Sequence, residues 1–192
     1  MDLPSSFGRY ELLEVVGKGA MGLVYRARHK ALENTVAVKL LHPRCSANEK
    51  LLQRFLSEAK AAGRLSHPNV VRGIDAGEVE GRYFLVMEFV DGPALDRMIA
   101  EGGRLPEERA LRIVLDIARA LGHAQENRVV HRDVKPGNIL VGKDGKAKLT
   151  DLGLATRLDI DEKKPGTAMG TPDYISPEQI QARSDVDIRS DI

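Results

Sequence analysis

The sequence HRDVKPGN at residues 131–138, with DLG at residues 151–153 a short distance beyond it, is the most informative part of the chain. These two segments supply two carboxylates, one carboxamide and one ammonium group, on loops expected at the edges of strands. Carboxylate and carboxamide oxygens bind Mg²⁺, and an ammonium group neutralises phosphate charge. The segments therefore indicate a site that holds a polyphosphate and Mg²⁺ beside a hydroxyl nucleophile.

A glycine-rich segment lies near the N-terminus. Gly17, Gly19 and Gly22 have the spacing G-x-G-x-x-G, which also occurs in Rossmann dinucleotide-binding folds. A Rossmann loop opens a helix, whereas residues 24–28 here alternate with the period of two that is typical of a strand. The segment is therefore predicted to be a hairpin whose glycines let backbone N–H groups approach phosphate.

Lys39 ends the apolar strand that is predicted at residues 36–39. An unpaired buried ammonium group is costly, so Lys39 needs an anion, either phosphate or a carboxylate from a neighbouring helix. A capping box at residues 46–49 is predicted to open that helix. Glu49 and Glu58 both offer a carboxylate, and Glu58 lies at the edge of the apolar face. That face is formed by Leu52, Phe55, Leu56 and Ala59.

The order and spacing of these motifs resemble those of a protein kinase catalytic domain, over residues 10–192. The resemblance is strongest to bacterial Ser/Thr kinases of the eukaryotic-like type. It implies an α+β fold with two lobes, preceded by an N-terminal extension at residues 1–9. The first lobe, residues 10–90, would hold an antiparallel sheet and one helix. We expect five strands, completed by Val70-Val71 and by residues 83–87. The second lobe, residues 91–192, would be mainly helical and incomplete.

The resemblance implies a role for each motif residue. Asp133 would be the catalytic base and Lys135 would neutralise the γ-phosphate. Lys39 would pair with Glu58 to orient the α- and β-phosphates, since the helix exit at residues 65–71 resembles the family's and favours Glu58 over Glu49. Asn138 and Asp151 would hold Mg²⁺, or Mn²⁺ in its place. The expected ATP contacts are Val16, Gly17, Gly19, Gly22, Val24, Ala37, Lys39, Met87, Glu88, Val90 and Leu140.

Two helices are expected in the second lobe, one at about residues 94–100 that ends at Gly102-Gly103 and one from Pro106 onward. Two residues depart from the family pattern. Gly73 stands where the family has an apolar side chain between helix and catalytic loop, or else marks a local strand irregularity. Leu152 replaces the usual phenylalanine and can fill the same core position. The apolar face of the second helix is predicted to contain Ala110, Val114, Ile117, Ala118 and Leu121.

Lys135 and the segment at residues 170–174 resemble Ser/Thr kinases and differ from tyrosine kinases. Thr171 would help to shape the pocket for the residue after the acceptor. Arg132 resembles the arginine that receives a phosphate on the activation loop. Thr167 is the first candidate for that phosphate and Thr156 the second, unless Thr167 is simply a solvated loop residue.

Composition limits the class of protein. The formal net charge of +1 gives the 192-residue chain no electrostatic bias toward nucleic acid or membrane, so protein substrates and ATP are the expected partners. Cys45 is the only cysteine, which excludes an internal disulfide and suits a reducing compartment. No segment resembles a signal peptide or is long enough to span a bilayer. We therefore expect a cytoplasmic protein, alone or as the cytoplasmic part of a membrane-anchored one.

The end of the chain leads to a further expectation. In the family, an aspartate like Asp191 opens a buried helix that braces the catalytic loop, and more helices follow. We expect a fragment with exposed apolar surface, marginally stable or inactive alone. The leading interpretation is a kinase that transfers the γ-phosphoryl group of ATP to Ser or Thr of proteins. The alternatives are an impaired nucleotide-binding fragment or pseudokinase, and a small-molecule phosphotransferase, which the substrate platform expected at residues 171–178 disfavours.

Overall fold

The computed structural model describes residues 5–152, 172–181 and 186–192, which fall into two compact units. The first unit contains the chain up to Gly63 together with Arg72–Val90, and the second contains Arg64–Val71 and the chain from Asp91 onward. The two-lobed α+β organisation expected from the sequence is confirmed. The segment Arg64–Val71, which the prediction placed in the first lobe, groups with the second unit.

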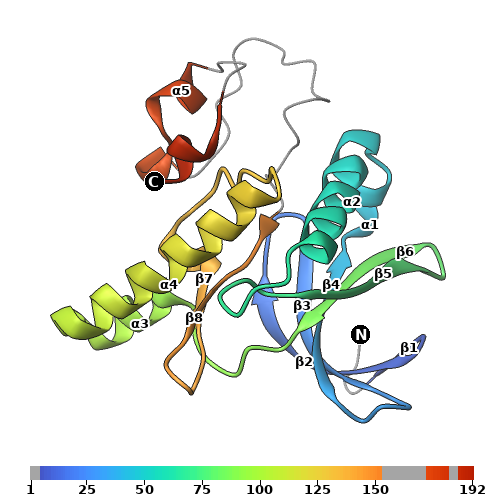
Figure 1. Cartoon of the computed structure of the whole chain (residues 1–192). Helices are drawn as coiled ribbons and strands as arrows, with labels where there is room; N and C mark the ends of the chain where they lie inside the picture. The colour runs from blue at the N-terminus through green and yellow to red at the C-terminus, as the bar shows by residue number, and fades with distance from the viewer. Residues whose placement is uncertain (1–4, 153–171, 182–185) are drawn as a thin grey trace. The chain divides into compact units, whose positions relative to one another are not determined.

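The first unit contains an antiparallel sheet of six strands in the order β1-β2-β3-β4-β6-β5 (Figure 1). The prediction of five strands, with Val70-Val71 among them, is wrong for two reasons. Residues 5–7, expected in an extension, pair with β2 as a short edge strand. Val71 instead donates its N–H to the carbonyl of Leu149, in the second unit. The strands are β1 (Ser5–Phe7), β2 (Tyr10–Lys18), β3 (Gly22–His29), β4 (Thr35–Leu41), β5 (Gly73–Val79) and β6 (Arg82–Glu88).

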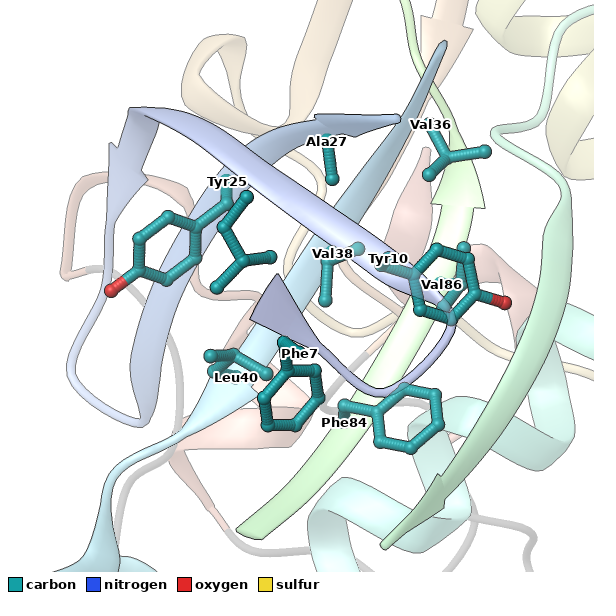
Figure 2. Close-up of a cluster of buried hydrophobic side chains, with 10 residues drawn as sticks. Phe7, Tyr10, Tyr25, Ala27, Val36, Val38, Leu40, Phe84 and Val86 are labelled. Carbon is teal, nitrogen blue, oxygen red and sulfur yellow. The ribbon is translucent and has the colours of Figure 1, made fainter. Parts of the chain in front are cut away.

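One face of this sheet carries the core of the first unit (Figure 2). Successive side chains of a strand point to opposite faces, so Tyr25 and Ala27 of β3 enter this core while Val24 and Arg26 lie on the other face. The rings of Phe7 and Phe84 close the core edge-to-face, with centroids 5.6 Å apart. The core cluster consists of Phe7, Tyr10, Leu12, Tyr25, Ala27, Val36, Val38, Leu40, Phe84 and Val86.

Two helices follow β4, the short α1 (Pro43–Ser46) and then α2 (Glu49–Arg64). The capping box predicted at Ser46 is wrong, because Asn48 caps α2 instead. Its Oδ1 accepts hydrogen bonds from the N–H groups two and three residues ahead, at 3.1 and 3.3 Å. Ser46 Oγ donates to the Pro43 carbonyl and so belongs to α1. The buried residues of α2 are Phe55, Glu58, Ala61 and Ala62.

Gly73 begins β5 at a close contact with α2. A Cβ atom at this position would lie 2.9 Å from the backbone carbon of Ala62 and 3.0 Å from its Cβ. The pairing of β5 with β6 also shifts register between Gly73 and Asp75. Gly73 therefore marks a strand irregularity, which was one of the two predictions for this residue. Its missing side chain lets α2 approach the sheet.

The second unit contains two helices and a small hairpin. The helices are α3 (Leu95–Gly102), which ends at Gly103 with a φ of 70°, and α4 (Glu107–Glu126). The hairpin pairs β7 (Ile139–Val141) with β8 (Ala147–Leu149), as predicted. Four short helical turns complete the described part: α5 (Pro177–Ile180) and 3-10 turns at Pro136–Asn138, Pro172–Tyr174 and Ile188–Asp191. No helix within the described residues is long and apolar enough to cross a membrane.

The apolar face predicted for α4 is partly wrong. Val114 is 65% exposed and Ala118 is also exposed. The helix carries two apolar stripes, and helical spacing alone does not tell which of them packs against β8. The buried stripe contains Ile113, Ile117, Ala120, Leu121 and Ala124. The exposed stripe contains Leu111, Val114 and Leu115, which agrees with the expectation of exposed apolar surface in this unit.

Candidate active site

The first unit pairs Lys39 with a carboxylate on α2. Lys39 Nζ lies 2.6 Å from Glu58 Oε1, and the two side chains are only 12% and 2% exposed. Glu49, the other candidate, is exposed at the start of the same helix. Since the ion pair is buried, it fixes the ammonium group of Lys39 on the sheet face opposite the core. The charge of Lys39 is thus oriented before any ligand binds.

The glycine-rich segment forms a tight hairpin between β2 and β3. Gly19 donates its N–H to the carbonyl of Gly22 at 2.9 Å, and Gly22 is the first residue of a strand rather than of a helix. A Cβ atom on Gly22 would lie 2.0 Å from the carbonyl oxygen of Leu40. Only glycine permits this approach, so the backbone of the hairpin is held close to β4. The geometry fits a loop whose N–H groups donate hydrogen bonds to phosphate and does not fit a Rossmann loop.

The end of β6 leads into the predicted hinge. Met87 is buried, and Glu88 is tied to Arg72 by two hydrogen bonds. The Glu88 N–H donates to the Arg72 carbonyl at 3.0 Å, and the Glu88 carboxylate accepts the Arg72 N–H at 2.8 Å. The amide of Glu88 is therefore occupied within the protein. The predicted contacts to adenine are therefore left to the remaining backbone groups of residues 88–90.

The residues predicted to form the catalytic loop lie together in the second unit. Lys135 Nζ lies 2.9 Å from Asp133 Oδ2. Asn138 Nδ2 donates to the Asp133 carbonyl at 2.7 Å and to Asp133 Oδ2 at 2.9 Å. These bonds orient the carboxamide, so that its oxygen is the group that can bind a cation. One carboxylate, one ammonium and one carboxamide therefore meet at Asp133.

The buried side chains of Asp191 and His131 hydrogen-bond to the backbone of this loop and of the residue before Asp151. Asp191 accepts the N–H groups of His131 and Arg132 at 2.7 and 2.6 Å. Burial raises the pKa of Asp191, while these two hydrogen bonds oppose that shift. His131 is fully buried, and its Nδ1 accepts the Asp133 N–H at 3.3 Å. Its Nε2 therefore carries the proton that is donated to the Thr150 carbonyl, 2.9 Å away.

Gln179 is a supporting residue that the sequence analysis missed. Its Nε2 donates to the Arg132 carbonyl at 2.8 Å. Gln179 also completes a capping box with Ser176 at the start of α5. The pattern Ser-x-x-Gln at residues 176–179 was a readable signal for the box. Nothing in the local pattern pointed to the contact with Arg132, because 47 residues separate the two partners.

Asp151 follows β8 and is exposed, with a φ of 59°. The neighbouring Thr150 donates its N–H to the Asn138 carbonyl at 2.9 Å, which links the segments of the two predicted Mg²⁺ ligands. Among the described residues, no three His, Cys, Asp or Glu side chains gather as a metal cage would require. Mg²⁺ commonly takes one or two protein oxygens and completes its shell with phosphates and water. A carboxamide and a carboxylate fit that mode of binding.

The comparison with protein families agrees with this arrangement of residues. The model of the protein kinase domain matches residues 10–192 of the chain. The chain belongs to the protein kinase family. Its kinase relatives include the serine/threonine-protein kinases PknH and PknD of Mycobacterium tuberculosis and PrkC of Bacillus subtilis.

PknH is 44% identical over 190 residues, which is 98% of this chain and 30% of PknH. PknD is 42% identical over 189 residues, covering 98% of this chain and 28% of PknD. PrkC is 40% identical over 173 residues, covering 90% of this chain and 27% of PrkC. The chain therefore spans less than a third of the length of these kinases.

The remaining predicted kinase residues are placed as follows. Leu140 lies in β7 and is half-buried, and Leu152 is buried, as expected for a residue that replaces phenylalanine in the core. Ala37 is buried in β4, whereas Val16 in β2 is 48% exposed. The candidate acceptors Thr167 and Thr156, the predicted pocket residue Thr171 and Gly153 lie outside the described residues.

Proposed function

We propose that the protein is an ATP-dependent Ser/Thr protein kinase, which transfers the γ-phosphoryl group of ATP to hydroxyl groups of Ser or Thr in proteins. The observation that carries the proposal is the group of Asp133, Lys135 and Asn138, held together within 2.9 Å. The relatives that bear the name serine/threonine-protein kinase support the choice of acceptor.

The chain's own residues divide the work between the two units. In the first, the glycine hairpin and Lys39 bind the phosphates, and Glu58 keeps the ammonium group in place. In the second, Asp133 orients the acceptor hydroxyl and takes its proton. Lys135 reduces the negative charge on the γ-phosphate. Asn138 and Asp151 would hold Mg²⁺, or Mn²⁺, and the cation would neutralise phosphate charge.

The residues proposed to contact the adenosine part of ATP belong to the first unit, except for Leu140, which belongs to the second. Apolar side chains provide the surface for the base, and the backbone of residues 88–90 provides hydrogen bonds to its edge. Such a division is common, since binding sites are mostly apolar with a few polar groups that fix orientation. The proposed base contacts are Val16, Val24, Ala37, Met87, Glu88, Val90 and Leu140, and the proposed phosphate contacts are Gly17, Gly19, Gly22 and Lys39.

The test is the intact mass of the purified chain after incubation with Mg²⁺ and ATP. We expect added phosphate on the parent chain and none on Asp133→Asn. Asp144→Asn is the matched control, because Asp144 is an exposed aspartate in the β7–β8 turn. Phosphate added equally to the parent and to Asp133→Asn would contradict the proposed role of Asp133.

A nucleotide-binding fragment or pseudokinase is the second candidate. The exposed stripe of Leu111, Val114 and Leu115 favours it, because an incompletely covered unit is less well ordered. A rise in melting temperature with Mg²⁺ and ATP, without added phosphate, would support this candidate. If the chain gains no phosphate and shows no rise in melting temperature, both candidate functions are overturned.

We further propose that phosphate on Thr167, or failing that on Thr156, activates the kinase through Arg132. The support lies in the backbone of Arg132, whose N–H and carbonyl are held by Asp191 and Gln179. A guanidinium group carried on a held backbone is suited to a phosphate, because charge-assisted hydrogen bonds are strong and directional. Thr171 would contribute to the pocket beside the acceptor. Unchanged activity and unchanged protease sensitivity in Thr167→Ala would refute the role of Thr167.

The expected partners follow from the proposed reaction. They are ATP and proteins with accessible Ser or Thr side chains, while the net charge of +1 gives no reason to expect nucleic acid. We place the domain in the cytoplasm, where ATP is made available to kinases.

A further inference from the structure

One side chain connects two strands of the first unit with the hinge. The guanidinium carbon of Arg26 lies 5.7 Å from the centre of the Phe89 ring. The same guanidinium donates from Nη1 to Glu14 Oε1 at 2.9 Å. Arg26 belongs to β3 and Glu14 to β2, while Phe89 follows β6 directly. Arg26 therefore contacts the hinge from the sheet, across strands that are distant in sequence.

The strand register places Arg26 on the face proposed to bind ATP. Arg26 lies opposite Ala37 on β4, and Val24 lies opposite Lys39. Directly opposite residues in an antiparallel pair share a face. Their neighbours Tyr25 and Ala27 point into the core on the other face, as Figure 2 shows. Arg26 thus lies directly across from Ala37, on the same face of the sheet as Lys39 and, on that face, one residue pair closer to the hinge.

The cation–π contact between Arg26 and Phe89 can restrain the backbone of the hinge. The Arg26 side chain is 43% exposed, but its Nε is buried and has no hydrogen-bond partner among the described residues. A cation over an aromatic ring is attracted more strongly when it is partly desolvated. A guanidinium also stays charged at every accessible pH and stacks as a plane, which an ammonium group does not do.

We propose that Arg26 is a positioning residue for adenine recognition, and that it acts by holding the hinge against the sheet through the ring of Phe89. The inference rests on the proposed function. The hinge would recognise the base through its backbone, so the position of the hinge, and not its side chains, sets affinity and selectivity for adenine. A hinge restrained before binding loses less conformational entropy when the base binds. The phosphates are bound by other groups and are unaffected by Arg26.

The test measures dissociation constants of ATP, GTP and tripolyphosphate, each with Mg²⁺, by calorimetry on the full chain. Arg26→Met keeps the apolar stem and removes the charge, and Phe89→Leu removes the ring. We expect each to weaken ATP binding about 2- to 10-fold, to reduce the preference for ATP over GTP, and to leave tripolyphosphate binding unchanged. Glu14→Gln is the matched control. It removes the ion pair and keeps the cation over the ring, so ATP binding should change less than about twofold.

Two further measurements separate positioning from general stability. The double variant of Arg26→Met and Phe89→Leu should weaken ATP binding no more than either single variant, because both remove the same contact. Arg26→Lys should recover only part of the loss. Additive losses, equal losses for tripolyphosphate, or unchanged ATP affinity would overturn the inference. If the parent chain binds tripolyphosphate and ATP equally, adenine recognition fails as well. If it binds neither, the proposed function fails first, and this inference with it.

Discussion

Glu58 is a charged residue that the fold places in a nearly water-free position on α2. Its carboxylate and the ammonium group of Lys39 each compensate the burial of the other. Removing one partner of a buried pair leaves an uncompensated charge, which is more costly than losing an exposed pair. We expect Glu58→Gln to lower the free energy of unfolding by about 3 kcal/mol. Glu49→Gln, an exposed change at the start of the same helix, should cost less than about 1 kcal/mol.

Urea denaturation of the two variants, followed by circular dichroism, measures the difference. Similar losses in both would mean that the pair with Lys39 contributes nothing beyond an ordinary surface charge. The comparison is independent of catalysis, so it remains informative if the chain proves inactive.

Tyr10 gives a second prediction at a single residue, one that depends on pH. Burial, and then the hydrogen bond that its hydroxyl donates to Asp75 at 2.9 Å, raise the pKa of Tyr10 to about 12. The fold therefore favours the neutral phenol, whose pKa in the unfolded chain is about 10. Its contribution to stability is complete below pH 10 and is lost as the pH rises from 10 toward 12. That contribution is roughly 2 kcal/mol.

Tyr10→Phe lacks this titration. We expect the parent chain to be more stable than the variant at pH 9 and to lose that advantage progressively above pH 10. Denaturation at several pH values, with phenolate absorbance as a second signal, measures it. A constant difference between the two proteins from pH 9 to 11 would be incompatible with a raised pKa.

At the scale of elements, the contact of β5 with α2 depends on one missing side chain. Gly73→Ala would place a Cβ within 3.0 Å of Ala62, so we expect a loss of about 1 to 3 kcal/mol of unfolding free energy. Gly63→Ala, on α2 itself, is the control, since a Cβ atom at Gly63 would meet nothing within 4 Å. It should stabilise the protein by about 0.5 kcal/mol through helix propensity. Melting temperatures distinguish the two, and equal effects would disprove the close contact.

Elements were predictable where their signal is local. The hairpin at Gly17–Gly22 and the end of α3 at Gly103 depend on neighbouring residues, and both occur where the sequence indicated. The helix cap was misplaced because Ser46 and Asn48 are equally good capping residues, and only the turn of α1 decides between them. On α4, two apolar stripes satisfied the same spacing, and packing chose the one with Ile117.

At the scale of the whole chain, exposed apolar surface on α4 has a measurable effect. Replacing Leu111 and Val114 with lysine should lower the fluorescence of a bound hydrophobic dye and change the stability by less than about 0.5 kcal/mol. Ile117→Ala, on the buried stripe, should cost about 2 to 4 kcal/mol and leave dye binding to the folded chain unchanged. A large loss of stability in the lysine variant would mean that the stripe is covered in solution.

The motif residues of the candidate site were predictable from the sequence, but the residues that hydrogen-bond to them from distant parts of the chain were predictable only in part. Asp133, Lys135 and Asn138 lie within six residues, so their proximity follows from the spacing of a short loop. Gln179 reaches Arg132 across 47 residues, and no local pattern reports a contact of that kind. The family resemblance gave Asp191 only as the first residue of a helix that braces the loop, and the hydrogen bonds of its own carboxylate to His131 and Arg132 were not predicted.

The hydrogen bond from the His131 N–H to Asp191 has a consequence for the time course of synthesis. The two residues are 60 positions apart, and a ribosome adding about 5 to 20 residues per second needs roughly 3 to 12 s to make that interval. The first unit is complete in sequence at Val90, well before Asp191 is made. A nascent chain therefore has all of its glycine hairpin, Lys39 and Glu58 for many seconds while the catalytic loop still lacks its brace. During that interval the residues proposed to bind phosphate are all present, while the residue that braces the proposed catalytic loop is not yet made.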